Sequence, residues 1–395
     1  MRILAIESSA DDTSVALIEG NPTVSPLSFT VHAHVTASQT IHQNYGGIFP
    51  AKAKGEHVAN IIPLIRKAFS AVASPVSLDS QALSHELQIL LSHESELISE
   101  LELLFAQFPN PPIDAIAVTY GPGLEPCLWV GVNTARALAM HFNIPLIPIN
   151  HMEGHTLSAL FEKPSKSGTS VLRSVQYPAM ALLISGGHTQ LVLMPKPLEY
   201  QVVGKTVDDA VGEAYDKVAR MMQLPYPGGP TLAALADEYR SLYKTRDSLL
   251  KNLFPRPMLH SANFDFSFSG LKTSVLYHIK DLNRMLSHED TMRLAYAFES
   301  AVSEVLAEKT RSALAHYQVN ALLLGGGVSN NRHLRRKFTH VCNDSAITLL
   351  LPEPEITTDN ALMIALAAFY RLSLLPMTEC VVLPENLKAN GNLKM

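Results

Sequence analysis

The sequence predicts an α/β protein with two lobes. Apolar strand-like runs alternate with helical stretches along the chain, and each half contains two short strands joined by a polar turn. The length of 395 residues also favours two domains over one. We expect a first lobe over residues 1–150, with a helical excursion at 70–112, and a second lobe over 151–360. A C-terminal helix and tail at 361–395 are expected to pack on the first lobe.

Composition excludes several classes of protein. A formal net charge of -5 argues against a surface coated with basic residues, so contact with nucleic acid must come from local patches or from a partner. Cys127, Cys342 and Cys380 lie far apart, which predicts buried free thiols in a reducing compartment rather than disulfides. Glu7 interrupts the opening apolar run too early for a signal peptide, and no apolar run is long enough to span a bilayer. We therefore expect a cytoplasmic protein with no membrane partner.

The first hairpin has an acidic turn. Strand-like runs at 3–6 and 14–18 flank a turn that contains Asp11 and Asp12 among serines and threonines. An ordinary tight turn uses one Asp with Gly or Asn. Two adjacent carboxylates therefore suit a place that positions a phosphate, a metal or a polar leaving group, although a solvated turn is an alternative.

The segment that follows joins a cationic helix to a leucine-rich excursion. Residues 52–67 form an amphipathic pattern with three lysines and one arginine, which indicates a solvated helix face or, alternatively, a patch that faces tRNA. Residues 70–112 are rich in Ser, Glu and Leu, and the leucines recur at helical spacing. We expect two helices there that are buried against their own lobe, with a partner or dimer surface as the alternative.

The second hairpin repeats the opening pattern. A strand at 179–184 ends in Ser185, Gly186, Gly187 and His188 before the chain returns as a strand at 191–194. One such hairpin in each half is the arrangement of a duplicated ribonuclease-H-like lobe, in which opposed hairpins clamp the phosphates of a nucleotide.

Two further segments suit a nucleotide. Three glycines at 325–327 follow a buried strand, and they allow the backbone to approach a ligand closely, with Asn331 nearby as donor and acceptor. A helix over 207–219 would place Asp209, Glu213 and Asp216 on one face. That face is either a solvated salt-bridged surface or a place for ribose hydroxyls.

A pair of histidines indicates a metal site. His151 and His155 lie four residues apart, so on a helix both side chains point to the same side and can hold one ion. Two imidazoles that bind iron or zinc usually take an oxygen or nitrogen partner. The best candidate for that partner is Asp359, directly before the apolar, helix-like residues 361–365. The alternative is that the histidines only pack or cap a helix.

The same pattern argues against a zinc protease. In the metalloprotease helix the glutamate directly follows the first histidine and acts on the metal-bound water. Here Met152 has that position, and Glu153 lies about 100° further around the helix, facing away from the pair.

Five motifs lie in order along the chain, at residues 151–155, 185–190, 226–230, 264–273 and 358–360. Together they resemble the tRNA N6-adenosine threonylcarbamoyltransferase family, which is called TsaD in bacteria and was formerly described as a glycoprotease family. The resemblance covers most of the chain, apart from the excursion and the last residues.

The resemblance implies an actin-like ATPase-domain (ASKHA) fold with a cleft between its two lobes. It further implies transfer of a threonylcarbamoyl group from threonylcarbamoyl-adenylate to N6 of the adenosine beside the anticodon in tRNAs that read ANN codons, forming t6A. The family's single divalent metal, with iron favoured over zinc, maps onto His151, His155 and Asp359. Its adenylate contacts map onto Leu183, Ile184, Ser185, Gly186, Gly187, Asp216, Gly229 and Asn331.

Other roles stay open at this point. Asp11 and His188 are both candidates for the base that accepts a proton from the attacking amine. Partners implied by the resemblance are tRNA and either TsaB-like and TsaE-like helper proteins or a second copy of the chain. The family usually has Cys where this chain has Ala10, so an essential thiol is excluded there. The rival functions are an ATPase or kinase of the same fold and a non-catalytic nucleotide-binding subunit.

Overall fold

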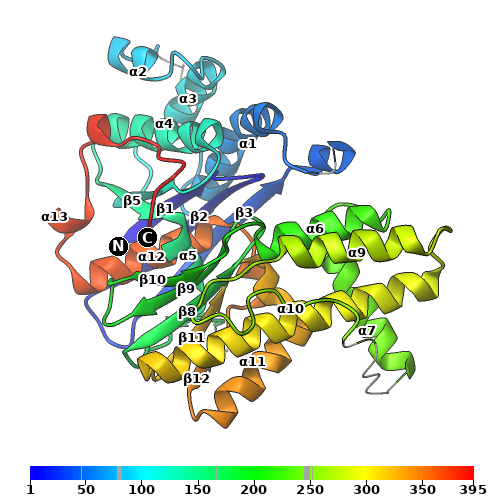
Figure 1. Cartoon of the computed structure of the whole chain (residues 1–395). Coiled ribbons are helices and arrows are strands. Elements are labelled where there is room, and N and C mark those ends of the chain that lie inside the picture. Colours follow the sequence, from blue (N-terminus) through cyan, green and yellow to red (C-terminus); the bar gives the residue numbers. More distant parts are fainter. Residues whose placement is uncertain (46, 78–81, 165–167, 244–249, 251) are drawn as a thin grey trace. The chain divides into compact units, whose positions relative to one another are not determined.

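A computed structural model of the chain is shown in Figure 1, and it describes residues 1–45, 47–77, 82–164, 168–243, 250 and 252–395. The chain forms two compact units. The first contains residues 1–41, 48–174 and 359–395, and the second contains residues 42–47 and 175–358. Residues 361–395 belong to the first unit, in line with the expectation that they pack on the first lobe. The division differs from the lobes expected at 1–150 and 151–360 because residues 151–174 also belong to the first unit and residues 42–47 to the second.

The first unit is built on a mixed sheet of seven strands in the order β5-β4-β1-β2-β3-β7-β6. β1 lies antiparallel to β2 and parallel to β4, and β5 continues the parallel part of the sheet. The strands are β1 (Arg2–Glu7), β2 (Asp12–Gly20), β3 (Ser28–Ser38), β4 (Ala115–Gly121), β5 (Leu146–Asn150), β6 (Phe161–Glu162) and β7 (Ser170–Leu172).

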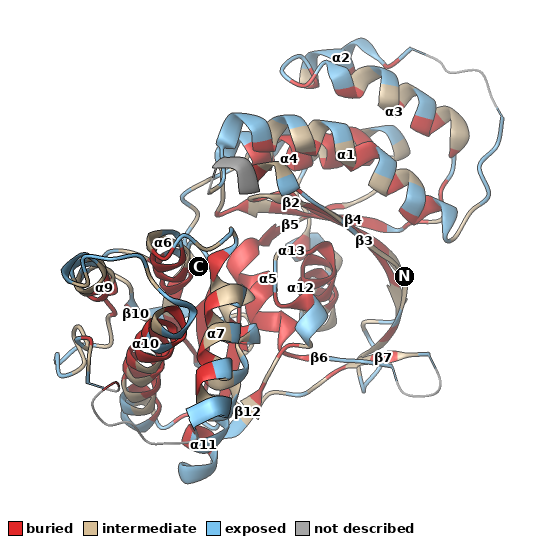
Figure 2. Cartoon of the chain, turned by 90° about the vertical axis from the view of Figure 1, so that its right-hand side faces the viewer, coloured by how far each residue is buried: buried red, intermediate tan, exposed pale blue. Residues whose placement is uncertain are grey.

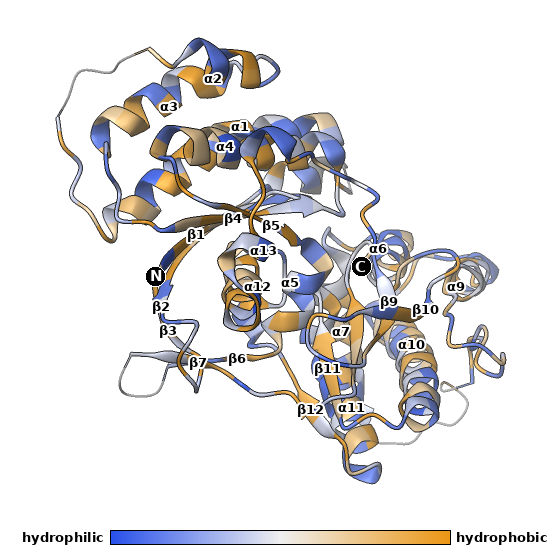
Figure 3. Ribbon diagram, turned by 90° about the vertical axis from the view of Figure 1, so that its left-hand side faces the viewer, coloured by the Kyte–Doolittle hydropathy of each residue, from blue (hydrophilic) through white to orange (hydrophobic). Residues whose placement is uncertain are grey.

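Helices cover both faces of this sheet (Figures 2 and 3). The helices α1 (Pro50–Ser70), α2 (His85–Leu90), α3 (Glu96–Gln107) and α4 (Glu125–Phe142) lie on one side, whereas α5 (His151–Ser158) and α12 (Ala361–Leu374) lie on the other. Leu4 and Ile6 belong to the core under the first group of helices. Every residue of β1 from Ile3 to Ile6 is fully buried, which explains its unbroken apolar sequence.

The excursion packs against its own unit. Leu97, Leu101 and Leu104 of α3 are fully buried in the core shared with α1 and α4. Two cations of α1 form ion pairs with the excursion: Lys54 Nζ lies 2.8 Å from a Glu94 carboxylate oxygen, and Arg66 Nη2 lies 3.2 Å from a Glu100 carboxylate oxygen. These two side chains therefore have a structural role.

The second unit repeats the strand order of the first. Its sheet has five strands in the order β10-β9-β8-β11-β12, with β8 antiparallel to β9 and parallel to β11. In the first unit β3-β2-β1-β4-β5 has the same order and the same directions. This is the duplicated ribonuclease-H-like arrangement of an actin-like ATPase domain, so the predicted fold class is confirmed. The strands are β8 (Ala179–Ile184), β9 (Thr189–Met194), β10 (Gln201–Lys205), β11 (Ala321–Gly325) and β12 (Thr348–Leu350).

The remaining elements are helical. The second unit contains α6 (Val211–Met221), α7 (Gly228–Tyr243), α9 (Ser269–Asp281), α10 (His288–Tyr317) and α11 (Arg332–Asp344), and α13 (Met377–Cys380) follows α12 in the first. Short 3-10 helices are η1 (Thr40–Tyr45), η2 (Gly327–Asn330), η3 (Pro354–Ile356) and η4 (Pro384–Asn386). Within the described ranges, none of these helices has the length and apolar character that crossing a membrane requires.

One local prediction is wrong. The helix expected over 207–219 begins only at Val211, so Asp209 precedes it. Lys217 lies 2.8 Å from Asp209 and 2.7 Å from Glu213, which makes this part of the surface a salt-bridged network. Asp216 is separate from that network, because its Oδ1 accepts from the backbone N–H of Gly228.

Candidate metal centre and nucleotide pocket

Helix α5 presents both histidines to the same place. Strand β5 ends at Asn150, whose side-chain oxygen accepts a hydrogen bond from the Met152 backbone N–H at 2.9 Å and so caps the helix. The helix therefore starts at His151, and His155 lies one turn later on the same side.

Close packing of α5 on α12 places the Asp359 carboxylate next to the two histidines. A Cβ on Gly154 would lie 2.9 Å from Ile364 Cδ1 and 3.1 Å from Met363 Cγ, so a larger residue there would push the helices apart. Asn360 caps α12 by accepting from the Met363 N–H at 3.0 Å. Asp359, immediately before this cap, is thereby placed next to the histidines.

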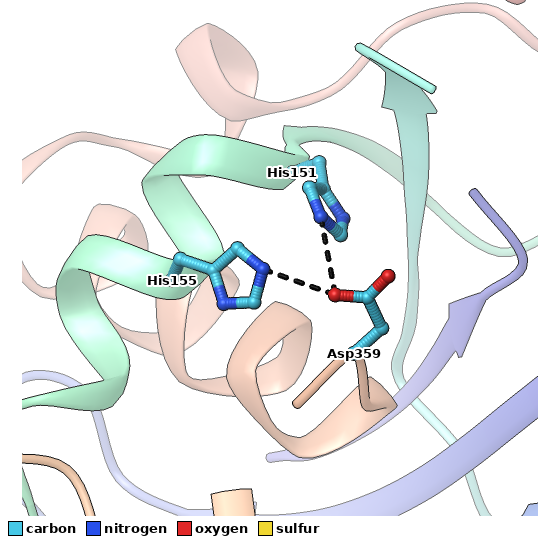
Figure 4. A group of neighbouring side chains, drawn as sticks. All are labelled: His151, His155 and Asp359. Carbon is cyan, nitrogen blue, oxygen red and sulfur yellow. Dashed lines mark hydrogen bonds and ion pairs between the residues drawn. The ribbon is translucent and has the colours of Figure 1, made fainter. Parts of the chain in front are cut away.

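The three side chains point at one another (Figure 4). Asp359 Oδ1 lies 3.0 Å from His155 Nε2 and 3.4 Å from His151 Nε2, and the three candidate ligand atoms lie within 4.8 Å of one another. The His155 side chain is fully buried, and its Nδ1 has no hydrogen-bond partner among the described residues. Two imidazole nitrogens that converge on one carboxylate oxygen form a group that can hold a metal ion, and this donor set suits iron or zinc.

A second carboxylate lies behind His151. Glu7 Oε2 lies 3.1 Å from His151 Nδ1, and Ser9 Oγ lies 3.1 Å from the same nitrogen. Thr119 donates to Glu7 Oε2, and the Ser9 N–H donates to Glu7 Oε1 at 2.6 Å. Glu7 is fully buried. Metal-binding histidines commonly hold such a carboxylate on the ring nitrogen that does not face the metal.

Sequence reasoning did not select Glu7 as part of the site. The available signal was a carboxylate that directly continues the apolar strand Ile3–Ile6, where a buried charge requires a partner. Its partner lies 144 residues away in the sequence.

The pKa shifts of His151 and Asp359 show that the two carboxylates favour a positive charge between them. Burial lowers the pKa of His151, but the carboxylates of Asp359 and Glu7 outweigh burial and raise it to about 10. Burial raises the pKa of Asp359, and the two histidines more than reverse this, so that it falls well below its ordinary value. Without a metal the His151 imidazolium therefore neutralises the carboxylates, and a bound metal ion would replace its proton.

Glu153 is committed elsewhere. Its carboxylate accepts hydrogen bonds from Arg371 of α12 at 2.6–3.1 Å, and only 1% of the side chain is exposed. It faces away from the histidines, as expected, so Glu153 does not have the position of the general base in a zinc protease.

The two candidate bases lie in different units. Asp11 lies in the turn between β1 and β2 of the first unit, and its backbone oxygen accepts from the Gln39 N–H at 3.2 Å. His188 lies in the turn between β8 and β9 of the second unit, where its N–H donates to Ser185 Oγ at 3.1 Å.

The second unit contains a pocket of about 580 Å³. Of the residues expected to contact an adenylate, Gly186, Asp216, Gly229 and Asn331 line it. Leu183 and Ile184 are fully buried in β8 and, like Ser185 and Gly187 in the adjoining turn, do not line it. The size of the pocket suits a nucleoside, and so does its lining, in which apolar surface is combined with polar side chains such as Asp237, Arg332 and Thr358.

Glycines permit the close approaches around this pocket. A Cβ on Gly212 would lie 2.5 Å from the Ser185 oxygen, and one on Gly326 would lie 2.5 Å from the Ile184 oxygen. Helix α6 and the turn after β11 therefore approach the end of β8 more closely than larger residues would allow. Asp216 Oδ1 fixes a third element by accepting from the N–H groups of Gly228 and Gly229 at the start of α7, at 2.7 and 3.3 Å.

The pocket residue Asn331 is held by Glu299, which also forms an ion pair with Arg240. Asn331 Nδ2 donates to Glu299 Oε1 at 2.5 Å, and Asn331 Oδ1 caps α11 by accepting from the Leu334 N–H at 3.0 Å. The other oxygen of Glu299 lies 2.5 Å from Arg240 Nη2. Burial raises the pKa of Glu299, while Arg240 and Asn331 oppose that rise. Sequence reasoning did not select Glu299 or Arg240.

These features define an α/β protein of duplicated ribonuclease-H-like units, with a metal-type donor group in one unit and a nucleoside-sized pocket in the other. A family model described as TsaD, tRNA N6-adenosine threonylcarbamoyltransferase, matches residues 30–82 and 91–366. The chain belongs to this family, as its five motifs predicted.

Curated relatives match nearly the whole chain. A tRNA N6-adenosine threonylcarbamoyltransferase from Staphylococcus saprophyticus is 38% identical over 368 residues, which is 93% of this chain and 90% of that protein. The enzyme of the same name from Nitrosospira multiformis is 38% identical over 377 residues, covering 94% of this chain and 91% of that protein. Among solved structures, full-length HypF in a phosphate- and nucleotide-bound form is similar with a TM-score of 0.47 and 11% identity, over 95% of this chain and 47% of HypF.

Proposed function

We propose that this protein transfers the threonylcarbamoyl group of threonylcarbamoyl-adenylate to N6 of an adenosine in tRNA, forming t6A. One observation carries the proposal: sequence motifs far apart in a chain of this family assemble into two compact sites. His155 and Asp359, 204 residues apart, meet in the first unit. Gly186, Asp216 and Asn331 meet around one pocket in the second unit.

The pocket of the second unit would hold the adenylate. Its apolar walls suit the base. Two polar residues of its lining, Asp216 and Asn331, are ones that the sequence predicts to contact a nucleotide. Holding the acyl donor still while the amine approaches lowers the barrier by removing translational and rotational freedom from the reacting state, worth roughly 7–11 kcal/mol at best.

The donor group of the first unit would hold one divalent metal ion per chain. His151 and His155 supply nitrogen and Asp359 supplies oxygen, a set that favours iron, with zinc as the alternative. A bound divalent ion supplies Lewis-acid polarisation of an acyl oxygen and neutralises phosphate charge. Glu7 and Ser9 hold the His151 ring in one orientation for this purpose.

In the reaction, a bond forms between N6 and the carbamoyl carbon while the bond from that carbon to the phosphate oxygen breaks. AMP leaves with the electron pair of the broken bond, and a base accepts the proton that N6 releases. Asp11 and His188 are the two candidates for this base. Because the substrate is tRNA, we place the reaction in the cytoplasm, with either TsaB-like and TsaE-like helper proteins or a second copy of the chain as partners.

The test is a reconstituted modification assay. The protein, an adenylate-forming enzyme and unmodified tRNA are incubated with threonine, bicarbonate and ATP, and the tRNA is digested and analysed for t6A. We expect t6A with the native protein and its loss in His151→Ala and Asp359→Ala. ATP hydrolysis without t6A, in the presence of active helper proteins, would instead support the ATPase rival. Light scattering of the protein with and without helpers identifies the partner.

A further inference from the structure

The C-terminal segment crosses the carboxyl ends of strands β4 and β5 in the first unit. The Asn390 N–H donates to the Tyr120 oxygen at 2.7 Å, and the Gly123 N–H donates to the Gly391 oxygen at 3.2 Å. Further along, Asn150 Nδ2 donates to the Lys394 oxygen at 3.1 Å. Residues 390–394 lie beyond the part of the chain that the family model matches, which ends at residue 366.

Glycines make room for this segment. A Cβ on Gly121 would lie only 2.0 Å from the Asn390 oxygen. A Cβ on Gly391 would lie 2.9 Å from the Gly123 oxygen. The fit is therefore specific on both sides, and larger residues at either glycine would lift the segment from the strand ends.

Two routes lead from the segment to His151. In the first, the turn after β4 contacts Ser9 closely: the Leu124 N–H donates to the Ser9 oxygen at 2.7 Å, and a Cβ on Gly123 would lie 2.6 Å from that oxygen. Ser9 Oγ in turn lies 3.1 Å from His151 Nδ1.

The second route runs through the helix cap. Asn150 uses its two side-chain atoms at once, since Oδ1 caps α5 at the Met152 N–H and Nδ2 bonds the Lys394 oxygen. The amide orientation of Asn150, and with it the first turn of the helix that carries His151, is thereby tied to the C-terminal segment.

We propose that residues 390–394 are a positioning segment for the metal centre. Docked on the strand ends, they hold Ser9 and Asn150 in place, and these two residues set the imidazole of His151 toward the metal. The inference rests on the metal role proposed above. It also has a reciprocal consequence: if the docked segment strengthens metal binding, then metal binding strengthens docking of the segment by the same factor.

The first test is a chain that ends at Ala389, titrated with Fe²⁺ and with Zn²⁺ by calorimetry under anaerobic conditions. Loss of groups that orient a metal ligand typically weakens affinity about 10–100-fold, and that is the expected result. Binding of AMP in the pocket of the second unit should stay within about twofold of the native value. Leu387, which is 4% exposed and packs in the core of the first unit, is kept in this variant.

Lys388→Ala is the matched control, because the truncation also removes one positive charge, that of Lys394. The control should bind metal as the full chain does. If the truncated protein does not fold, Gly391→Val displaces the segment without deleting it and should give the same loss of affinity. Native metal affinity in the truncated protein, or an equal loss in Lys388→Ala, would overturn the positioning role. Absence of metal binding in the full-length native protein would instead reject the metal role itself.

The second test uses hydrogen exchange of the full-length protein. Adding the metal should slow exchange of the Asn390 and Gly123 amides, which donate the bonds that dock the segment. The factor should match the ratio of metal affinities between the full and truncated chains. Exchange that is unchanged by the metal at both amides, at saturating metal, would reject the coupling.

Discussion

Glu7 Oε2 lies 3.1 Å from His151 Nδ1, while Nε2 of the same ring faces Asp359. One imidazole therefore joins a fully buried glutamate of β1 to the carboxylate that precedes α12. When Nε2 binds a metal, the glutamate holds the proton on Nδ1. This hydrogen bond makes Nε2 a stronger metal ligand.

We expect Glu7→Gln to weaken metal binding about 10–100-fold, because the amide cannot hold the Nδ1 proton as a carboxylate does. The measurement is calorimetric titration with Zn²⁺ and anaerobic titration with Fe²⁺. Glu153→Gln is the matched control: Glu153 is equally buried but pairs with Arg371, so the variant should lose stability and keep its metal affinity. Equal losses of affinity in both variants would contradict a specific role for Glu7.

Gly154→Ala tests the packing that brings Asp359 to the histidines. The added methyl group would meet Ile364 Cδ1 at 2.9 Å and Met363 Cγ at 3.1 Å, so α5 and α12 must move apart. Overpacking of this kind costs roughly 1–3 kcal/mol of folding free energy. We expect lower stability by urea unfolding together with weaker metal binding. Gly55→Ala in α1 is the control, since no atom of the described residues lies within 4 Å of its added Cβ. Loss of stability with native metal affinity would show that the donor group tolerates the shift.

The sequence predicted those site residues that local spacing marks. His151 and His155 are one helical turn apart, and the glycines that follow β8 and β11 form runs, so each is visible in a short window. Asp359 could be selected because a helix start follows it. The positions of the strands could be predicted in the same way, since both faces of β1 and β8 are buried and their sequences are continuously apolar.

Residue pairs that are distant in the sequence and meet only in the folded chain could not be predicted from local patterns. Glu7 is the one acidic residue of β1, and Glu299 is one of several in the long helix α10. Their partners His151 and Asn331 lie 144 and 32 residues away. The division of the chain depends on pairing of the same kind, because β7 joins the first unit through antiparallel pairing with β3. No local pattern records that pairing, so the unit extends to residue 174 rather than 150.

Asp12 should make the stability of the metal-free protein depend on pH. Burial, together with the charges of Asp11, Asp359 and Glu7, raises the pKa of Asp12 to about 7 from an ordinary value of 3.8, with a hydrogen bond from Ser38 in opposition. The folded state therefore binds more protons than the unfolded state between these values, and stability falls as pH rises through that window. Asp12→Asn should remove this fall.

The measurement is the free energy of unfolding in urea at several pH values, with chelator present. At pH values above 7 we expect Asp12→Asn to be more stable than the native chain by roughly 1–2 kcal/mol after allowance for solvent screening. At pH values below 4 the two chains should not differ on this account. A gain of the same size at both ends of the range would exclude titration of Asp12 as its cause.

The last prediction concerns Glu299, which accepts a hydrogen bond from Asn331 with one oxygen and pairs with Arg240 through the other. Glu299→Ala removes one of the two hydrogen bonds of the Asn331 side chain and one of the two carboxylate partners of Arg240, which keeps Asp237 at 3.0 Å. We expect AMP affinity to fall by about 1–2 kcal/mol, roughly 5–30-fold, because the amide of Asn331 is no longer held at the pocket wall. Stability should fall by about 1–3 kcal/mol, less than for a fully buried pair, because Arg240 is 19% exposed and keeps its contact with Asp237.

Glu299→Gln separates these two effects. Its amide oxygen can still accept from Asn331, whereas its charge no longer balances Arg240, so AMP affinity should return close to the native value while stability stays low. Calorimetric AMP titration and urea unfolding measure the two quantities. Glu304→Gln is the control on the same helix, because Glu304 pairs with Arg256 and its side chain is 45% exposed. Equally poor AMP binding in the Ala and Gln variants would mean that charge at position 299 matters to the pocket, and not the orientation of Asn331.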